Sequence, residues 1–410
     1  MDKIELMAPA GSWEALHAAI RAGADSVYFG LGALNMRSHS GHNFTFEDLP
    51  EIVQICQKSS VKSYVTLNTV IYDDDMTWME EACRTIKASG ATAVIACDIA
   101  AIQYARSVGL NVHISTQLNV SNCEGVRFFS QFSDVIVLAR ELNLEQVRAI
   151  CERIKRDDIR GPSGQLVKIE IFIHGALCVS ISGKCYMSLA QYNKSANRGE
   201  CLQACRRKYR VIDEESNQEL VIDNKYVMSP KDLCTVGILD QLVSSGVTVF
   251  KIEGRGRSPE YVHTVTGVYR EALNAVYEGS FSPARVEEWT ERLATVYNRG
   301  FWHGGYYLGQ PVGEWSGTNG SCATTRKKFI GTVTNYFSKI GVAECTISSD
   351  ALEVGNKVLI MGKTTGVIEE IVKALGEEGA PQRAEKGEIV SFPTSARVRR
   401  GDKVYVVEAR

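Results

Sequence analysis

The chain has 410 residues, of which 44% are hydrophobic and 23% charged, and its formal net charge is −2. These values are typical of a globular protein larger than one small domain, and they exclude a strongly basic nucleic-acid coat and a polyacidic tail. The first residues, MDKIELMAPAGSWEAL, lack the features of a secretory signal, and no run of 18 or more apolar residues occurs. We therefore expect a cytoplasmic protein without a membrane span.

Short apolar runs alternate with amphipathic stretches over roughly the first 280 residues. Most runs are rich in Val and Ile, as buried parallel strands are; they occupy residues 4–8, 26–30, 63–67, 93–97, 111–115, 134–139, 167–173 and 248–252. The amphipathic stretches predict helices over residues 12–22, 76–89, 99–107, 122–131 and 144–155. Eight strands alternating with helices predict a TIM-like (βα)8 barrel, and a doubly wound open sheet is the alternative.

The domain organisation follows from where this alternation is interrupted. We expect the barrel to span residues 1–280, with an insertion at about 178–247 between its seventh and eighth strands. Residues 281–320 are rich in Trp and Tyr and are interpreted as a connecting segment that packs on both domains. Residues 321–410 contain short strands separated by Gly, Asp, Asn and Lys, which predicts a small antiparallel β-barrel domain.

Four of the twelve cysteines lie close together in the insertion, with the spacing C-x6-C-x15-C-x3-C; they are Cys178, Cys185, Cys201 and Cys205. Cytosolic thiols stay reduced, so such a group favours metal binding or catalysis over disulfides. Zinc sites usually contain pairs of tightly spaced cysteines, and only the last pair here is tight. The spacing therefore favours an iron–sulfur cluster, with ordinary buried cysteines as the alternative and Cys234 as a reserve ligand.

Charged residues follow the two last predicted barrel strands. Glu170 and His174 lie four residues apart on the seventh strand, so they should share a face if the strand continues. Lys251 and Glu253 alternate in the same way after the eighth strand and could pair. We interpret these four as candidate catalytic groups for proton transfer, with structural ion pairs as the alternative.

Further polar residues are expected at the barrel mouth. Loops after the last strands of barrels often bind anions, and Arg255 and Arg257 occupy this position. Other strand-end residues are candidate substrate ligands, namely Asn68, Gln117 and Arg140, and a glycine-rich loop adds Arg37, His39 and His42. Basic runs at 205–210, 326–328 and 396–403 could contact phosphate backbones, although such runs are usually solvated surface.

The stretch EIFIHGALCVSISGKCYMS (170–188) resembles the signature of the collagenase-like peptidase family U32, whose catalytic type is unknown. The positions that fit the signature are Glu170, Phe172, Gly175, Cys178, Gly183, Cys185 and Ser188. LMAPAGSWEALHAAIRAGADSVYFG near the start and KIEGRGRSPEYV near the eighth strand also resemble that family. The C-terminal β-domain is similar to that of the branch called the tRNA hydroxylation protein P group.

This resemblance implies prephenate-dependent 5-hydroxylation of the wobble uridine of tRNA. It also implies a four-iron four-sulfur cluster on Cys178, Cys185, Cys201 and either Cys205 or Cys234. Prephenate would bind Arg255 and Arg257, tRNA would bind the C-terminal domain, and a paralogous protein or a second copy could be a further partner. Sister branches hydroxylate a cytidine of 23S rRNA or a ubiquinone precursor.

Two other functions remain as alternatives, a collagenase-like peptidase and a non-catalytic iron–sulfur subunit. A cysteine peptidase needs one thiolate beside a histidine and an orienting group, whereas the sequence groups four cysteines. The HExxH motif of zinc peptidases does not occur.

Overall fold

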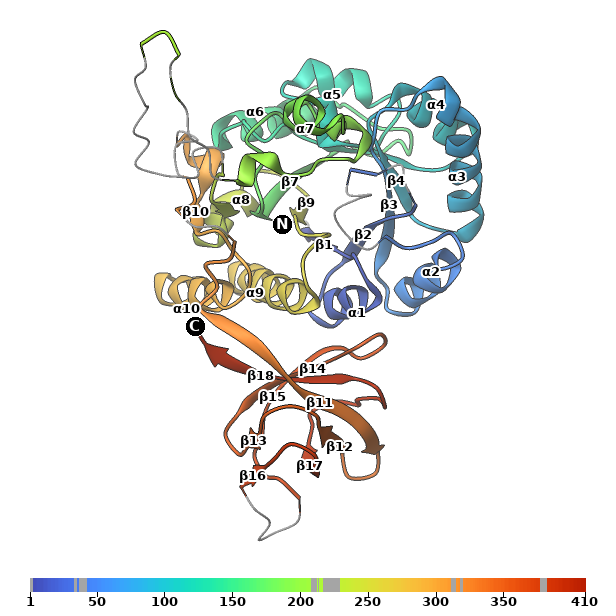
Figure 1. The fold of residues 1–410 in the computed structure, drawn as a ribbon. Helices are drawn as coiled ribbons and strands as arrows, with labels where there is room; N and C mark the ends of the chain where they lie inside the picture. The colour runs from blue at the N-terminus through green and yellow to red at the C-terminus, as the bar shows by residue number, and fades with distance from the viewer. Residues whose placement is uncertain are drawn as a thin grey trace.

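The computed structural model describes residues 3–32, 35–36, 43–207, 212, 214–216, 229–310, 315–317, 320–376 and 382–410. It contains a helix-covered barrel and a separate antiparallel sheet, which lies beside α1, α9 and α10 of the barrel (Figure 1). Among the described residues, no helix combines the length and apolarity that a membrane crossing requires.

Eight parallel strands form the barrel. They are β1 (Glu5–Pro9), β2 (Ser26–Gly30), β3 (Lys62–Leu67), β4 (Ala93–Ala96), β5 (Val112–Ile114), β6 (Val135–Val137), β7 (Lys168–Gly175) and β9 (Val249–Ile252). The first seven pair in chain order, and β9 pairs with both β1 and β7, which closes the sheet. The predicted (βα)8 barrel is confirmed, and the open doubly wound sheet is excluded.

Side-chain hydrogen bonds cap helices in the first six repeats. The Ser12 side chain caps the first helix by accepting the Ala15 N–H at 3.2 Å, and Asn143 and Gln146 form a reciprocal capping box at the sixth. These helices are α1 (Trp13–Arg21), α2 (Leu49–Lys58), α3 (Met76–Ser89), α4 (Ile99–Ser107), α5 (Cys123–Phe129) and α6 (Leu144–Arg156). All five predicted helices are present, and α2 is an additional one.

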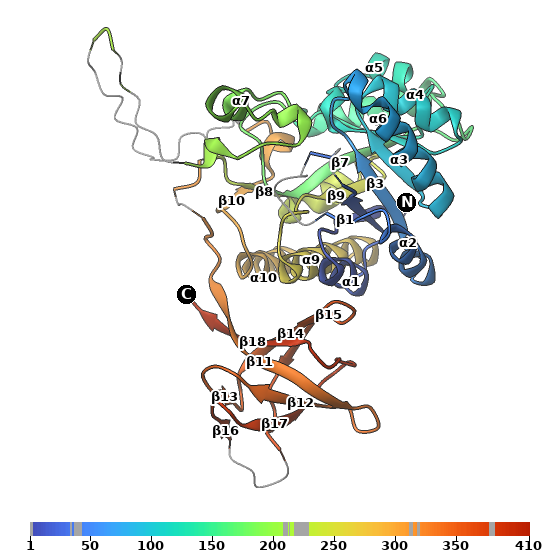
Figure 2. The same ribbon diagram turned by 45° about the vertical axis from the view of Figure 1, so that its right-hand side comes forward.

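The connection between β7 and β9 contains more structure than the sequence indicated. It holds α7 (Met187–Tyr192), the strand β8 (Asp232–Cys234) and α8 (Leu239–Val243). β8 pairs antiparallel with the end of β7 and parallel with β10 (Phe301–His303), so it extends the sheet beside the barrel. Figure 2 shows α7 near β7 and β8, at the side of the barrel that faces away from the second sheet.

Two long helices follow the last barrel strand, α9 (Pro259–Glu278) and α10 (Pro283–Ala294). α10 lies in the segment that the sequence suggested as a connector. Its Trp289 is buried in the main hydrophobic core, and the Trp289 indole nitrogen donates to Glu271 of α9 at 3.3 Å. The aromatic residues of this segment therefore contribute to the core of the barrel.

The second sheet has six antiparallel strands in the order β15-β14-β18-β11-β12-β17. Their bounds are β11 (Thr325–Phe337), β12 (Val342–Ile347), β14 (Lys357–Gly362), β15 (Gly366–Ile371), β17 (Ile389–Pro393) and β18 (Lys403–Ala409), and a small sheet joins β13 (Leu352–Glu353) to β16 (Arg383–Ala384). Over the described residues the end strands β15 and β17 do not pair with each other. The predicted small antiparallel β-domain is confirmed; it has its own core, and over the described residues its sheet is open between these two strands.

Candidate functional site

A buried ion pair lies inside the barrel. Glu170 of β7 is fully buried, and its Oε1 is 2.8 Å from Nζ of Lys251 on the neighbouring strand β9. The Lys251 ammonium also lies over the Tyr28 ring, 4.5 Å from its centroid. Burial raises the pKa of Glu170, but Lys251 and His113 outweigh this effect and hold the pKa below its ordinary value. Lys251 therefore pairs with Glu170, whereas the sequence suggested Glu253 as a possible partner.

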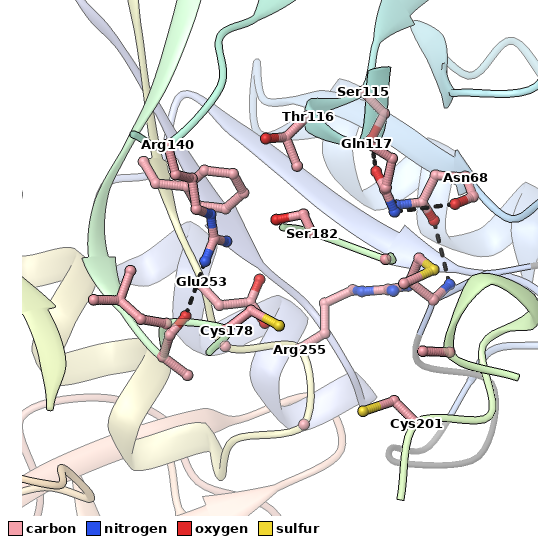
Figure 3. A pocket seen from close by; sticks show the side chains of 18 of the residues that line it. Asn68, Ser115, Thr116, Gln117, Arg140, Cys178, Ser182, Cys201, Glu253 and Arg255 are labelled. Carbon is pink, nitrogen blue, oxygen red and sulfur yellow. Dashed lines mark hydrogen bonds between the residues drawn. The ribbon is translucent and has the colours of Figure 1, made fainter. Parts of the chain in front are cut away.

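A cavity of about 210 Å³ opens at the carboxyl ends of the barrel strands (Figure 3), where the active sites of such barrels are built. Its described lining contains five arginines and one lysine but a single acidic residue, Glu253. The predicted residues that line it are Asn68, Gln117, Arg140, Lys251, Glu253, Arg255, Arg257 and the cysteines Cys178, Cys185, Cys201 and Cys205. Such a lining favours an anionic ligand.

Arg140 extends along one wall of this cavity. Its guanidinium stacks on the Phe172 ring at 3.9 Å, and Nη1 donates to the Ala176 carbonyl oxygen at 3.2 Å (Figure 3). Its Nε is buried and has no hydrogen-bond partner. A buried donor without a partner costs free energy, so this guanidinium is suited to a ligand that accepts a hydrogen bond.

Arg255 and Arg257 come from the loop after β9. Arg255 is buried, and its Nη1 donates to Asn35 Oδ1 at 3.0 Å and to Thr66 Oγ1 at 2.7 Å. Arg257 stacks on the Tyr297 ring, with 3.7 Å between the guanidinium carbon and the centroid. Both guanidinium groups are thus held in place by neighbouring side chains.

Asn68 follows β3 and Gln117 follows β5, and the two residues contact each other although β4 lies between these strands in the sheet. The Gln117 side-chain amide donates to the Asn68 carbonyl oxygen at 3.1 Å, and the Asn68 amide donates to Gln117 Oε1 at 3.4 Å (Figure 3). These contacts fix both amides on the cavity wall, where they can bind polar groups of a ligand.

The four predicted cysteine ligands meet at this cavity, on the segment that follows β7. Burial raises the pKa of the Cys205 thiol, and the neighbouring thiols of Cys178, Cys201 and Cys185 raise it further, whereas the Arg206 guanidinium lowers it. Arg206 is held by Ser229 Oγ at 3.1 Å and by the Pro230 carbonyl oxygen at 3.2 Å. A positive charge is thereby fixed beside Cys205, where it offsets part of the effect that burial has on the pKa of that thiol.

The four thiols could hold either a single metal ion or a multi-iron cluster. Among the described residues, no three His, Cys, Asp or Glu side chains lie close enough together for one ion. A single zinc ion at 2.3 Å from each sulfur would draw the sulfurs to within about 4 Å of one another. The four thiols line one cavity beside the fixed Arg206 guanidinium, so Cys178, Cys185, Cys201 and Cys205 are the residues that would hold a metal group here.

Cys234, the reserve ligand, lies in β8 and does not line the cavity. Its thiol is fully buried beside Tyr269, and burial raises its pKa to about 11. Cys205 is therefore the better candidate for a fourth ligand.

The expectation that His174 shares a face with Glu170 is wrong. The register between β7 and β9 shifts between Phe172 and His174, which interrupts the simple alternation of faces. The imidazole packs against the Tyr269 ring, with 5.4 Å between centroids, and its Nδ1 is 3.3 Å from the Tyr269 hydroxyl. His174 does not line the cavity.

Two residues that line the cavity were not predicted from the sequence. Arg206 belongs to a basic run that resembles solvated surface, and Arg299 stands outside any motif, although its Nη1 is 3.2 Å from buried Asp232. No pattern in the sequence indicates which residues these two guanidinium groups would contact. The loop residues Arg37, His39 and His42 and the last three residues of the basic run 205–210 lie outside the described residues.

Comparison with known proteins decides the family. The model described as peptidase family U32 matches residues 11–317. The chain belongs to this family. A U32 relative named collagenase, from Porphyromonas gingivalis, is 52% identical over 100% of this chain and 99% of its own. The predicted family is therefore confirmed.

Two more distant relatives of this U32 protein carry names from RNA modification. The tRNA hydroxylation protein P1 of Bacillus subtilis is 33% identical, over 82% of this chain and 78% of its own. The 23S rRNA 5-hydroxycytidine C2501 synthase of Escherichia coli is 33% identical, over 90% of this chain and 55% of its own. The higher identity is thus to a protein named as a collagenase.

Proposed function

We propose that this U32 protein is an RNA-modifying enzyme that hydroxylates the wobble uridine of tRNA with an iron–sulfur cluster and prephenate. One observation carries the proposal: four thiols and a set of fixed arginines line the same cavity at the barrel mouth. Such a cavity combines a site for a redox group with a site for an organic anion. Relatives named for tRNA and rRNA hydroxylation support RNA as the substrate class.

Prephenate, which the family resemblance implies, carries two carboxylates. Arg140 and Arg257 are suited to binding them because each guanidinium is held flat against an aromatic ring at the cavity. Arg255 is anchored through Nη1 and adds positive charge between the strand ends. The amides of Asn68 and Gln117 would bind the remaining polar groups of the ligand or of the base.

Proton transfer in the cavity falls to Lys251 and Glu253, which both line it. Glu170 orients the ammonium of Lys251 from below, whereas the Glu253 carboxylate accepts a hydrogen bond from the Tyr28 hydroxyl at 3.2 Å. A cluster held by Cys178, Cys185, Cys201 and Cys205 would supply electron transfer when bound. A wobble base lies in a single-stranded loop, so it can leave its stack at low cost to enter the cavity.

A peptidase is the second candidate, because the relative with 52% identity is named a collagenase. Peptide hydrolysis by a cysteine requires a base beside the thiol. No histidine lines the described cavity, and His174 is separated from it by the β7 register shift. A peptidase would therefore need a different nucleophile and base from those that the cavity offers.

Nucleoside analysis tests the two candidates. Deletion of the gene should remove hydroxyuridine-derived nucleosides from bulk tRNA, and wild-type protein should restore them. Cys201→Ser should fail to restore them, whereas Cys322→Ser, outside the cavity, should succeed. An unchanged nucleoside profile in a strain without a paralogue would refute the hydroxylase. Cleavage of denatured collagen that survives iron removal and substitution of all four cysteines would establish the peptidase.

The cluster can be tested separately on protein purified without oxygen. We expect about four irons per chain and a broad absorption band near roughly 400 nm, both lost in Cys201→Ser. A colourless wild-type protein with about one zinc ion would contradict the cluster.

A further inference from the structure

The segment from Cys178 to Arg207, here called the cysteine segment, has two different sides. Its pocket-facing residues include the four cysteines, Ser182, Gln203 and Arg206. Several large apolar side chains of the same segment are exposed to solvent instead, namely Ile181, Tyr186, Leu189, Tyr192 and Leu202. Tyr186 is 77% exposed, an unusual position for an aromatic ring beside a cavity. Several exposed apolar groups on one short segment are candidates for a surface that binds a partner.

The charge of this segment indicates what kind of partner fits. It contains five basic residues, Lys184, Lys194, Arg198, Arg206 and Arg207, against the single acidic residue Glu200. Glu200 is 3.0 Å from Lys194, so it does not offset the others. Lys184 is exposed and forms no ion pair with any described residue. Because Arg206 faces the cavity and Arg198 pairs with Asp75, the positive charge of the outer surface comes from Lys184 and Arg207. An aromatic surface with such exposed cations matches single-stranded nucleic acid, whose bases stack and whose phosphates are negative.

The two sides of the cysteine segment differ in how well they suit RNA. On the border toward β3, Asp73, Asp74 and Asp75 follow the exposed ring of Tyr72, and Arg198 is paired with Asp75. These carboxylates would repel phosphates. On the α7 side, the Arg207 guanidinium lies 5.1 Å from the Tyr192 ring centroid and bonds its hydroxyl. The α7 side is therefore the one suited to RNA.

We infer that a single-stranded RNA loop binds on the outer face of the cysteine segment, with bases stacked on Tyr186 and Tyr192 and phosphates at Lys184 and Arg207. This inference rests on the proposed function and adds to it the surface that receives the RNA. The cavity lies on the other side of the same segment. A base next to the stacked ones can then enter it while its neighbours stay bound.

The C-terminal domain, which the sequence suggested as the tRNA-binding part, has fewer basic side chains available to bind phosphates. In its run at 326–328, Arg326 is 3.0 Å from Glu408, Lys327 is 2.8 Å from Glu260, and Lys328 is paired with Asp350. Arg397 and Arg400 are exposed without a described ion pair, and they form the alternative surface at which RNA could bind.

Binding of synthetic RNA to the anaerobically purified full chain tests the inference. The probes are an RNA hairpin with uridine in its loop and a fully paired duplex of equal length. Wild type should prefer the hairpin. Tyr186→Ala/Tyr192→Ala should weaken hairpin binding by at least about tenfold, since each stacked base contributes substantially. Lys184→Gln should lower the slope of log affinity against log salt by about 0.7.

Matched controls separate this surface from general effects. Phe128→Ala removes an aromatic ring that is 53% exposed on α5, and Lys339→Gln removes an exposed cation of the second domain; both should bind as wild type does. Iron content should be equal in all variants, because none removes a cysteine.

Three results would overturn the inference. One is hairpin binding that is unaffected by the tyrosine and lysine variants, and another is binding lost only in Arg397→Gln/Arg400→Gln. The third is no hairpin binding by wild type, which would favour a protein partner for the exposed apolar side chains. Nucleoside profiles keep the two proposals apart: tRNA that is modified normally by the tyrosine variant refutes the surface alone, and hairpin binding without any tRNA modification refutes the hydroxylase alone.

Discussion

Lys251 and Glu170 illustrate how a single buried pair prepares the site. Both side chains are almost fully buried, and their attraction compensates for the loss of hydration only while both are present. Glu170 Oε2 lies 3.8 Å from His113 Nδ1, too far for a hydrogen bond, and the His113 ring packs on Tyr64. The ammonium is therefore held at the cavity by interactions from inside the barrel.

Removing one partner of this pair should be costly. We expect Lys251→Met to lower the free energy of unfolding by about 3–5 kcal/mol, because it leaves the Glu170 carboxylate buried without its cation. Glu170→Leu/Lys251→Met should recover much of that loss. Urea unfolding of the wild type, both single variants and the double variant measures the coupling. Additive losses would show that the two charges do not interact.

His174 should make stability depend on pH. Burial, with a smaller contribution from Arg257, lowers the pKa of His174 from 6.5 to about 3. His174 therefore takes up a proton below about pH 6.5 in the unfolded chain but only below about pH 3 in the folded protein. Because the unfolded chain binds more protons between these values, the free energy of unfolding falls as the pH falls through this window. Between pH 7 and pH 5 the loss from this residue should be about 2 kcal/mol.

Chemical denaturation at several pH values checks this effect. His174→Phe retains an aromatic ring among Tyr261, Tyr269 and Phe301 but cannot be protonated. Its unfolding free energy should fall by about 2 kcal/mol less than that of wild type over the same pH range. Equal slopes for both proteins would mean that His174 is protonated alike in the folded and unfolded chains.

At the scale of elements, the end of β7 determines where the cysteine segment starts. Gly175 has φ of 105°, a left-handed conformation that side chains rarely adopt. A Cβ atom there would lie 2.5 Å from the Glu253 carbonyl oxygen, in the loop that carries the cavity arginines. The glycine thus allows the β7 and β9 loops to approach each other at the cavity.

Gly175→Ala should therefore destabilise the fold and disturb the cysteines. The matched control is Gly164→Ala, which has φ of 77° but no atom within 4 Å of its added Cβ. Both pay the conformational cost of about 1 kcal/mol, and only Gly175→Ala adds a clash. We expect a larger loss of stability and of bound iron for Gly175→Ala, measured by thermal unfolding and iron analysis. Equal effects of the two variants would exclude close approach as the reason for glycine.

The strands were predictable and their irregularities were not. Val- and Ile-rich runs located all eight barrel strands because burial on both sides demands such residues. The register shift between Phe172 and His174 depends on pairing with β9, about 80 residues away, so His174 was assigned to the wrong face. The aromatic residues of 281–320 predict a connector packed on both domains, whereas the helix α10 that carries Trp289 into the barrel core was not predicted.

For the whole molecule, the barrel prediction largely determined the candidate site. Strand-end residues from Asn68 to Arg257 converge because the carboxyl ends of all barrel strands lie at one mouth. Arg206 and Arg299 reach the same cavity from segments outside the repeats, where no periodic pattern exists to place them. Their inclusion depends on contacts with Ser229 and Asp232 that only the folded chain brings together.

The barrel and the second sheet are joined by a small apolar contact of Ala18 on α1 with Leu359, Met361 and Val367. An ion pair of 2.8 Å between Lys327 and Glu260 lies between the same two domains. This contact makes the stability of the sheet depend on the barrel, although each has its own core.

Val367→Asp should uncouple the two domains, because it buries an unpaired carboxylate between them at a cost of about 3–5 kcal/mol. Ile371→Asp, on the exposed end of the same strand, is the control and should change stability little. Scanning calorimetry of Val367→Asp should show the sheet unfolding below the barrel transition. Iron binding should persist, because all four proposed cysteine ligands belong to the barrel part of the chain. A single transition lowered as a whole, together with loss of iron, would mean that the cavity depends on the second sheet for its structure.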